Sequence, residues 1–94
     1  MQVSHQKKYY AGIGSREAPA LIQGFFTKLA ERLAGQGYVL RSGGAAGADK
    51  AFEKGCDEAS GEKEIFLPWA GYNDSDSTLI VNCNLPHYFD LLLV

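Results

Sequence analysis

The sequence predicts an α/β fold in which a mainly parallel sheet lies between helices, as a small three-layer α/β/α sandwich. Short apolar runs of strand length alternate with longer segments that have helical periodicity. Glycine-containing turns follow the first two of these runs, as expected where a strand leads directly into a helix. A chain of 94 residues is near the small end for one self-sufficient core. We therefore expect a single domain over 1–94, with a sheet that stops after the third or fourth strand.

The composition is that of an ordinary globular protein. Apolar residues make up 46% of the chain and charged residues 21%, which argues against disorder. A net charge of -2 disfavours a general duplex-DNA binder, which needs a basic surface. It is compatible with one small anion held in a local pocket. Cys56 and Cys83 show no CxxC spacing, and the N-terminal region has no run long enough to cross a membrane, so we expect a cytoplasmic protein.

The first strand and turn follow a loose arm over 1–7. Residues 8–14 are rich in aromatic and small side chains and predict a buried strand that ends in the turn 14–17. Arg16 in this turn either pairs with Glu17 or Asp49, or clamps a phosphate. Pro19 is typical of the first position of a helix. The helix that follows is expected to pack on the core through one stripe, made of Leu21, Ile22, Phe25, Phe26, Leu29 and Leu33.

The second strand, over 38–40, leads into the most glycine-rich turn of the chain, residues 41–49. A strand, a glycine-rich turn and a helix start are the general design of a phosphate cradle, because the N–H groups and the dipole of the helix favour an anion. The alternative is a tight turn of small residues. Asp49, in the first turn of the helix, either offsets the helix dipole, accepts hydrogen bonds from a ligand hydroxyl or holds Arg16. The helical pattern ends at Gly61.

A third strand is predicted over 63–69, ended by Pro68, which cannot donate to a ladder. Trp69 after it either stacks on a nucleobase or covers the end of the small core. Open parallel sheets bind ligands beyond the carboxyl ends of their strands, so the three turns are expected to converge there. Residues 74–94 form a divergent tail with a strand over 78–81. Its apolar end, 88–94, is expected to be buried against the sheet or another chain, which favours a homodimer.

The two turns together resemble the SLOG superfamily. The segments 10–17, 40–49, 51–55 and 64–69 are similar to its DprA/Smf-like and YpsA-like branch, whose members phages often encode. The resemblance covers roughly residues 9–73. It implies a Rossmann-like sheet that binds nucleotides, nucleotide-derived signals or, in the DprA branch, single-stranded DNA. The ligand contacts that it implies in this chain are Gly14, Ser15, Arg16, Ser42, Gly43, Gly44, Gly47 and Asp49.

The function expected from these features is binding of a nucleotide or nucleotide-derived small molecule. The PGGxGTxxE stretch of the phosphoribohydrolase branch is absent, so no catalytic residue is assigned, and we expect no metal and no cofactor. The full set of candidate ligand-binding residues is Gly14, Ser15, Arg16, Glu17, Ser42, Gly43, Gly44, Gly47, Asp49, Pro68 and Trp69.

Two alternative functions remain open at this point. One is DprA-like binding of single-stranded DNA in recombination, which needs several cations and aromatic rings along one path. The other is hydrolysis of a nucleotide N-glycosidic or phosphoester bond, with Glu17 or Asp49 as the base. The nucleic-acid alternative would use Arg16, Arg41, Lys50, Trp69 and Tyr72.

Overall fold

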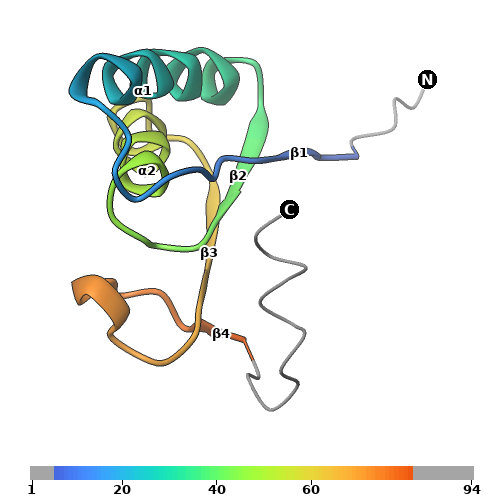
Figure 1. The fold of residues 1–94 in the computed structure, drawn as a ribbon. Coiled ribbons are helices and arrows are strands. Elements are labelled where there is room, and N and C mark those ends of the chain that lie inside the picture. Colours follow the sequence, from blue (N-terminus) through green and yellow to red (C-terminus); the bar gives the residue numbers. More distant parts are fainter. Residues whose placement is uncertain (1–5, 82–94) are drawn as a thin grey trace.

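The computed structural model describes residues 6–81. Its elements are β1 (Lys8–Ala11), α1 (Ala20–Gly35), β2 (Tyr38–Ser42), α2 (Ala48–Glu58), β3 (Lys63–Leu67), a 3-10 turn (Tyr72–Asp74) and β4 (Leu79–Ile80). All the strand pairs are parallel, in the spatial order β1-β2-β3-β4 (Figure 1). The predicted α/β class and the parallel sheet are confirmed.

Both helices lie on the same face of this sheet (Figure 1). Each crossover advances by one strand in the same direction, and right-handed crossovers then place their helices on one side. The two helices also pack closely on each other, and the hydroxyl of Thr27 in α1 donates to the carbonyl of Ala51 in α2 at 3.0 Å. Residues 6–81 therefore form two of the three expected layers, namely one layer of helices and the sheet.

The core fills the space between the helices and the sheet. The ring of Phe26 in α1 stacks on that of Phe52 in α2, with centroids 4.5 Å apart. Burial raises the pKa of the Cys56 thiol, which donates to the carbonyl of Glu62 at 3.4 Å, so Cys56 is a core residue, as predicted. The buried cluster consists of Ala30, Leu40, Phe52, Cys56, Ile65 and Leu67.

The apolar stripe of α1 is buried only in part. Phe26 and Leu29 pack against the core, whereas Leu21, Ile22 and Phe25 are 84%, 41% and 61% exposed. The expectation that the whole stripe packs on the core is wrong for these first turns. For Leu21 the reason is geometric: at about 100° per residue, Leu21 and Phe26 point about 140° apart, too far for one contact face to bury both.

The prediction that the first strand is buried is wrong, because β1 lies at the edge of the sheet and is mostly exposed. The ends of the strands also differ slightly from the expected ones. β1 ends at Ala11 rather than at residue 14, although the N–H of Gly12 still donates to the carbonyl of Arg41 at 2.9 Å. β2 continues to Ser42, two residues further than predicted. β3 ends at Leu67, directly before Pro68, as expected.

Several expectations fall outside the described residues. They concern the first part of the N-terminal arm, Cys83 and the apolar end over 88–94. Within residues 6–81, no helix has both the length and the apolar character needed to cross a membrane.

Removing the hydroxyl of Tyr10 is expected to stabilise the fold. This oxygen is buried and has no hydrogen-bond partner among residues 6–81, while the ring packs edge-on against Tyr38 and Phe52. Tyr10→Phe keeps the ring contacts and removes an unsatisfied polar group, so the free energy of unfolding should rise by about 1 kcal/mol. Urea denaturation of both proteins at pH 7 measures this change, and a loss of stability would show that the hydroxyl is satisfied.

The same substitution should change the response to high pH. Burial raises the pKa of Tyr10 from 10.0 to about 12. Between these values the unfolded chain releases the phenolic proton before the folded chain does, so the stability of the wild type falls as the pH rises. The Phe variant lacks this contribution, and its stability should fall less over the same range.

Candidate functional site

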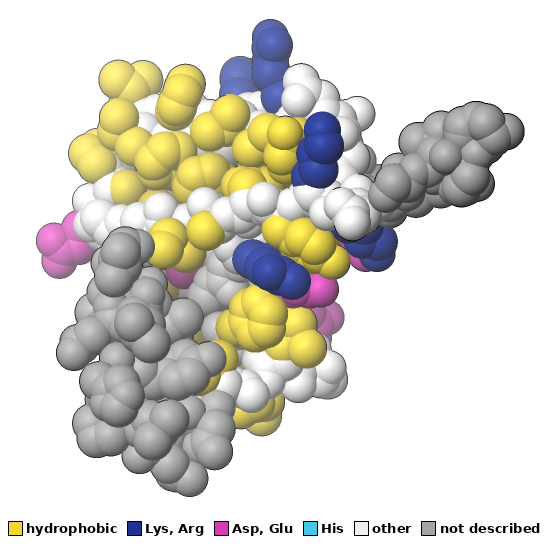
Figure 2. All heavy atoms as spheres, turned by 90° about the vertical axis from the view of Figure 1, so that its right-hand side faces the viewer, with side chains coloured by type: hydrophobic (Ala, Val, Ile, Leu, Met, Phe, Trp, Pro, Cys, Tyr) yellow, Lys and Arg dark blue, Asp and Glu magenta, His cyan; other side chains and the backbone are white. Residues whose placement is uncertain are grey.

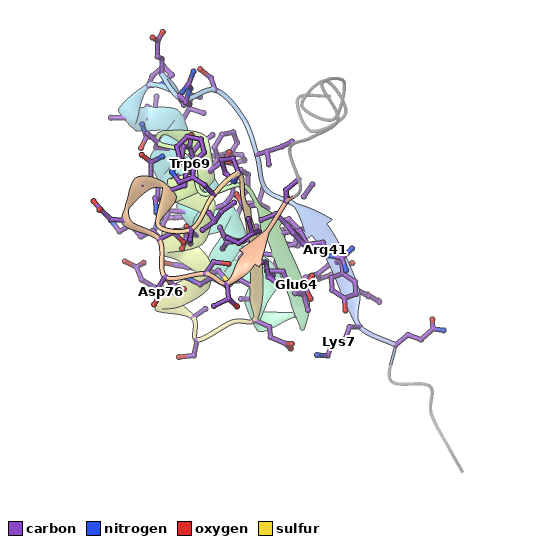
Figure 3. All side chains as sticks on the ribbon, turned by 90° about the horizontal axis from the view of Figure 1, so that it is seen from below. Lys7, Arg41, Glu64, Trp69 and Asp76 are labelled. Atoms are coloured by element: carbon purple, nitrogen blue, oxygen red, sulfur yellow. The ribbon has the colours of Figure 1, made fainter. Side chains whose placement is uncertain are left out.

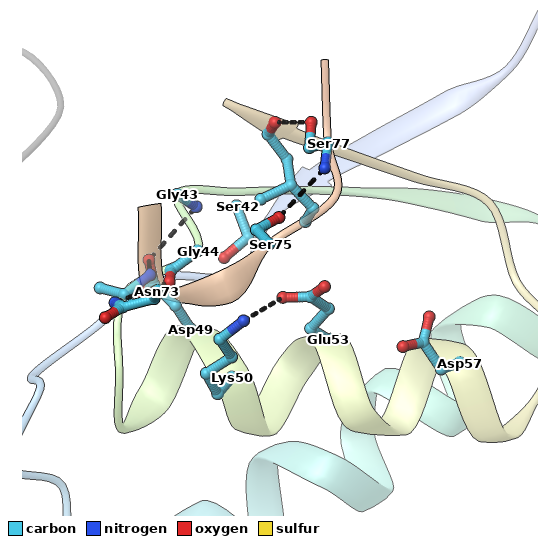
Figure 4. A network of polar contacts seen from close by, with 12 residues as sticks. Ser42, Gly43, Gly44, Asp49, Lys50, Glu53, Asp57, Asn73, Ser75 and Ser77 are labelled. Atoms are coloured by element: carbon cyan, nitrogen blue, oxygen red, sulfur yellow. Dashed lines mark hydrogen bonds and ion pairs between the residues drawn. The ribbon is translucent and has the colours of Figure 1, made fainter. Parts of the chain in front are cut away.

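Three turns that are distant in the sequence meet at the carboxyl edge of the sheet. The first N–H of α2, from Ala48, donates to the carbonyl of Ser15 in the turn after β1 at 3.0 Å. The side-chain amide of Asn73, in the loop after β3, donates to the carbonyl of Gly44 at 3.1 Å (Figure 4). The turn after β2 therefore contacts both of the others, and the predicted convergence is present.

Asp49 lies at the centre of this arrangement and is only 5% exposed. Its Oδ1 accepts a hydrogen bond from the N–H of Gly14 at 3.2 Å. Its Oδ2 accepts from the N–H groups of Gly43 at 3.2 Å and Ala45 at 3.4 Å (Figure 4). One carboxylate thus joins the turn after β1 to the turn after β2.

This geometry bears on the roles considered for Asp49, which lies in the first turn of α2 as the helix-dipole role requires. Burial raises its pKa, and the hydrogen bonds from Ala45, Gly14 and Gly43 offset this only in part. Within the described chain it forms no ion pair with Arg16. Because the carboxylate is shielded from water and already accepts three N–H groups, it is a positioning residue. It is poorly placed to accept a ligand hydroxyl or to act as a base.

Gly47 and Ser42 hold the same two turns together. Gly47 has a φ of +78°, and a Cβ there would overlap the carbonyl oxygen of Arg16, so only glycine permits this approach. The buried hydroxyl of Ser42 donates to the carbonyl of Gly12 at 2.7 Å. For these two residues the tight-turn interpretation is sufficient.

Several groups at this edge remain available to a ligand. Among the described residues, the N–H groups of Ala46 and Gly47, just before α2, donate to no protein atom. Arg16 is exposed and forms no ion pair within 6–81, so neither of the expected carboxylate partners holds it. Glu17 is also exposed, and its N–H donates to the hydroxyl of Ser15 at 3.0 Å.

The aromatic residues after β3 have separate roles. Trp69 is 60% exposed, so the interpretation in which it covers the end of the core is wrong. Tyr72, which packs against the core, covers this end instead. The two rings meet edge-on with centroids 5.0 Å apart. Trp69 lies in the loop that follows β3 (Figure 3).

Two of the cations in the nucleic-acid alternative are paired. Arg41 and Glu64 lie on the face of the sheet away from the helices (Figure 3), where Nε of Arg41 donates to Oε1 of Glu64 at 2.9 Å. The Arg41 guanidinium also stacks over the ring of Tyr9, 3.8 Å from its centroid. Lys50 lies 3.6 Å from Oε1 of Glu53. Of these three cations, Arg16 is therefore the one that has no ion-pair partner in the part of the chain that the structure describes.

The sequence analysis missed a polar network along α2. Nζ of Lys63 in β3 lies 2.9 Å from a carboxylate oxygen of Glu53 and 2.8 Å from one of Asp57. Burial lowers the pKa of Lys63, but its hydrogen bonds to Asp57 and Glu53 raise it by more. These contacts tie β3 to α2. The only signal in the sequence was the spacing of Glu53 and Asp57, one helical turn apart.

A hollow of about 260 Å³ adjoins this network, between α2, β3 and residues 75–79. It is separate from the N–H groups of Ala46 and Gly47. Within 6–81, no group of three or more His, Cys, Asp or Glu residues is arranged to hold a metal ion.

No family model, curated protein or solved structure matches this chain. The resemblance to the SLOG superfamily therefore depends on the two turn motifs.

Proposed function

We propose that this chain binds a nucleotide or a nucleotide-derived small molecule at the carboxyl edge of its sheet. The observation that carries this proposal is the convergence of the turns after β1, β2 and β3, linked by the hydrogen bonds of Asp49 and Asn73. This edge is where open parallel sheets bind their ligands. Membership of the SLOG superfamily, inferred from the same turns, favours the same class of ligand.

The ligand phosphate is best accommodated at the start of α2. The N–H groups of Gly14 and Gly43 are already used by Asp49, whereas those of Ala46 and Gly47 are open. They add to the positive end of the helix dipole. The backbone of Arg16 packs directly against Gly47, so its guanidinium is within reach of an anion held there, and it can bind phosphate in a bidentate manner.

A small ligand suits this edge better than an extended nucleic-acid strand. Strand binding requires several free cations along one path, and Arg41 and Lys50 are engaged by Glu64 and Glu53. Among the described residues at this edge, one unpaired arginine, Arg16, and one exposed aromatic ring, Trp69, match a single phosphate and a single base. The chain's net charge of -2 agrees with this choice.

A thermal-shift screen tests the proposal. Mononucleotides, dinucleotides, cyclic nucleotides and short single-stranded oligonucleotides are compared as ligands. A small nucleotide should raise the Tm, because a ligand at 100 times its Kd adds about 2.7 kcal/mol to the stability of the native state. If only oligonucleotides raise the Tm, the nucleic-acid alternative is favoured instead, and if no compound does, the proposal fails.

Trp69→Ala should weaken the binding of the nucleotide found in this screen. Because Trp69 is 60% exposed, its removal should leave the fold intact. The loss of stacking should cost about 1–3 kcal/mol of binding free energy, measured by titration calorimetry. Phe25→Ala is the matched control, since Phe25 is a similarly exposed ring, 61%, in α1. An equal loss in both variants would show that Trp69 does not contact the base.

A further inference from the structure

Trp69 is set apart from the other strongly exposed apolar side chains. Leu21 and Phe25, which are 84% and 61% exposed, belong to α1, where hydrophobic side chains gather at the top of the molecule (Figure 2). The loop after β3, which carries Trp69 at 60% exposure, lies near the bottom of the view in Figure 1. The position of this ring therefore depends on the contacts of its own loop.

Tyr72 is the residue of this loop that holds Trp69. The N–H of Tyr72 donates to the carbonyl of Trp69 at 3.3 Å, and the two rings meet edge-on with centroids 5.0 Å apart. The ring of Tyr72 also packs against the core. Whatever fixes the backbone at Tyr72 therefore fixes the indole as well.

Asn73, the next residue, joins this loop to the turn after β2. Its side-chain amide donates to the carbonyl of Gly44 at 3.1 Å (Figure 4). Its φ is +50°, in the left-handed region that asparagine adopts more readily than most residues other than glycine. Glycine would meet the backbone requirement equally well. The property that glycine lacks is the amide, which donates to one particular backbone carbonyl.

The acceptor of this hydrogen bond belongs to a turn that is already fixed. The N–H groups on both sides of Gly44, from Gly43 and Ala45, donate to the carboxylate of Asp49 at 3.2 and 3.4 Å. Gly44 is buried, and a Cβ there would lie 2.8 Å from a side-chain carbon of Leu67. The partner that the hydrogen bond positions is therefore the loop after β3, and not the turn after β2.

We propose that Asn73 is the positioning residue for Trp69 in the nucleotide site, and that its hydrogen bond to Gly44 sets the spacing between the base and the phosphate. This inference rests on the proposed function. Gly44 belongs to the turn that leads to the N–H groups of Ala46 and Gly47, which donate to no atom of the described chain. One hydrogen bond thus links the turn that holds the phosphate to the loop that holds the base. Because the ring is ordered before binding, the ordering cost falls for a ligand with both parts at this spacing.

The fluorescence of Trp69 tests the first half of this proposal without any ligand. Trp69 is the single tryptophan of the chain, so its anisotropy reports the mobility of the loop after β3. Asn73→Gly keeps the left-handed backbone and removes the hydrogen bond to Gly44. The anisotropy of Trp69 should therefore decrease, while the circular dichroism spectrum of the protein stays unchanged.

Asp74→Gly is the matched control. Asp74 also has a positive φ, +60°, but within residues 6–81 its side chain forms no hydrogen bond or ion pair. A glycine in the same loop should then leave the anisotropy of Trp69 close to that of the wild type. An equal decrease in both variants, or no decrease in Asn73→Gly, overturns the proposal.

Affinity measurements separate positioning from a general loss of structure. Asn73→Gly should weaken the binding of the nucleotide found in the screen by about three- to tenfold, the usual loss for one hydrogen bond. The Kd of inorganic phosphate, measured by NMR titration, should not change, because phosphate does not contact Trp69. In the Trp69→Ala background, Asn73→Gly should have almost no effect on nucleotide binding, since the ring that Asn73 positions is gone.

Three results of these titrations would overturn the proposal. They are an unchanged nucleotide affinity in Asn73→Gly, an equal loss for nucleotide and inorganic phosphate, and a full loss in the Trp69→Ala background. If no nucleotide binds even to the wild type, the proposed function fails. The anisotropy of the two glycine variants then still decides whether Asn73 holds Trp69 in place.

Discussion

Gly55→Ala is expected to destabilise the protein by about 3 kcal/mol, the upper end of the usual cost of overpacking a core. Gly55 is buried in α2. A Cβ at this position would overlap the carbonyl oxygen of Thr27 in α1 and lie 2.8 Å from the Cβ of Ala30. Backbone atoms of a packed helix cannot move aside, so the two helices would have to separate. Urea denaturation at pH 7 measures this loss of unfolding free energy through the shift of the denaturation midpoint.

Gly35→Ala is the matched control for this prediction. Gly35 also lies in a helix, α1, but a Cβ there would meet nothing within 4 Å. The same substitution should therefore leave stability unchanged or raise it by about 0.5–1 kcal/mol. If the two variants were equally stable, the close contact between α1 and α2 would be contradicted.

Asp49→Asn is expected to cost about 2–3 kcal/mol of folding free energy. The carboxylate accepts N–H groups from both turns with its two oxygens. An amide keeps one acceptor, and its NH₂ group faces a buried N–H donor, so at least one N–H loses its partner. Because Asp49 is the link between the turns after β1 and β2, the substitution should also reduce nucleotide binding.

Asp57→Asn provides the comparison on the same helix. Its carboxylate is 54% exposed and pairs with Lys63, and exposed ion pairs contribute at most about 1 kcal/mol. This variant should therefore be nearly as stable as the wild type. A similar loss for Asp57→Asn and Asp49→Asn in chemical denaturation would mean that the buried carboxylate has no special role.

The sequence was sufficient for the fold class because local signals agreed along most of the chain. The apolar runs indicated the strands, the helical spacings indicated the helices and the glycine turns indicated the connections between them. Pro68 marked the end of β3. The convergence of the turns followed from the parallel arrangement alone, since the carboxyl ends of parallel strands share one edge.

What the sequence could not decide was how the elements contact each other. The exposure of Leu21 and Phe25 depends on which side of α1 meets α2, and that side is set by the close approach at Gly55. The role of Asp49 depends on an N–H group 35 residues away, that of Gly14. The sequence did carry a signal for the face of the sheet on which Arg41 lies. Arg41 follows the buried Leu40 in a strand, where successive side chains point to opposite faces.

The most direct test of the proposed function is the affinity of the nucleotide found in the screen for Arg16→Ala and Arg41→Ala, measured by titration calorimetry. Both substitutions remove one exposed arginine, but only Arg16 lies unpaired beside the start of α2. Arg16→Ala should lose about 1.5–3 kcal/mol of binding free energy, the usual value for a hydrogen bond to a charged group. Arg41→Ala should bind like the wild type. Unchanged affinity in Arg16→Ala, or an equal loss in both variants, would contradict a phosphate site at this edge.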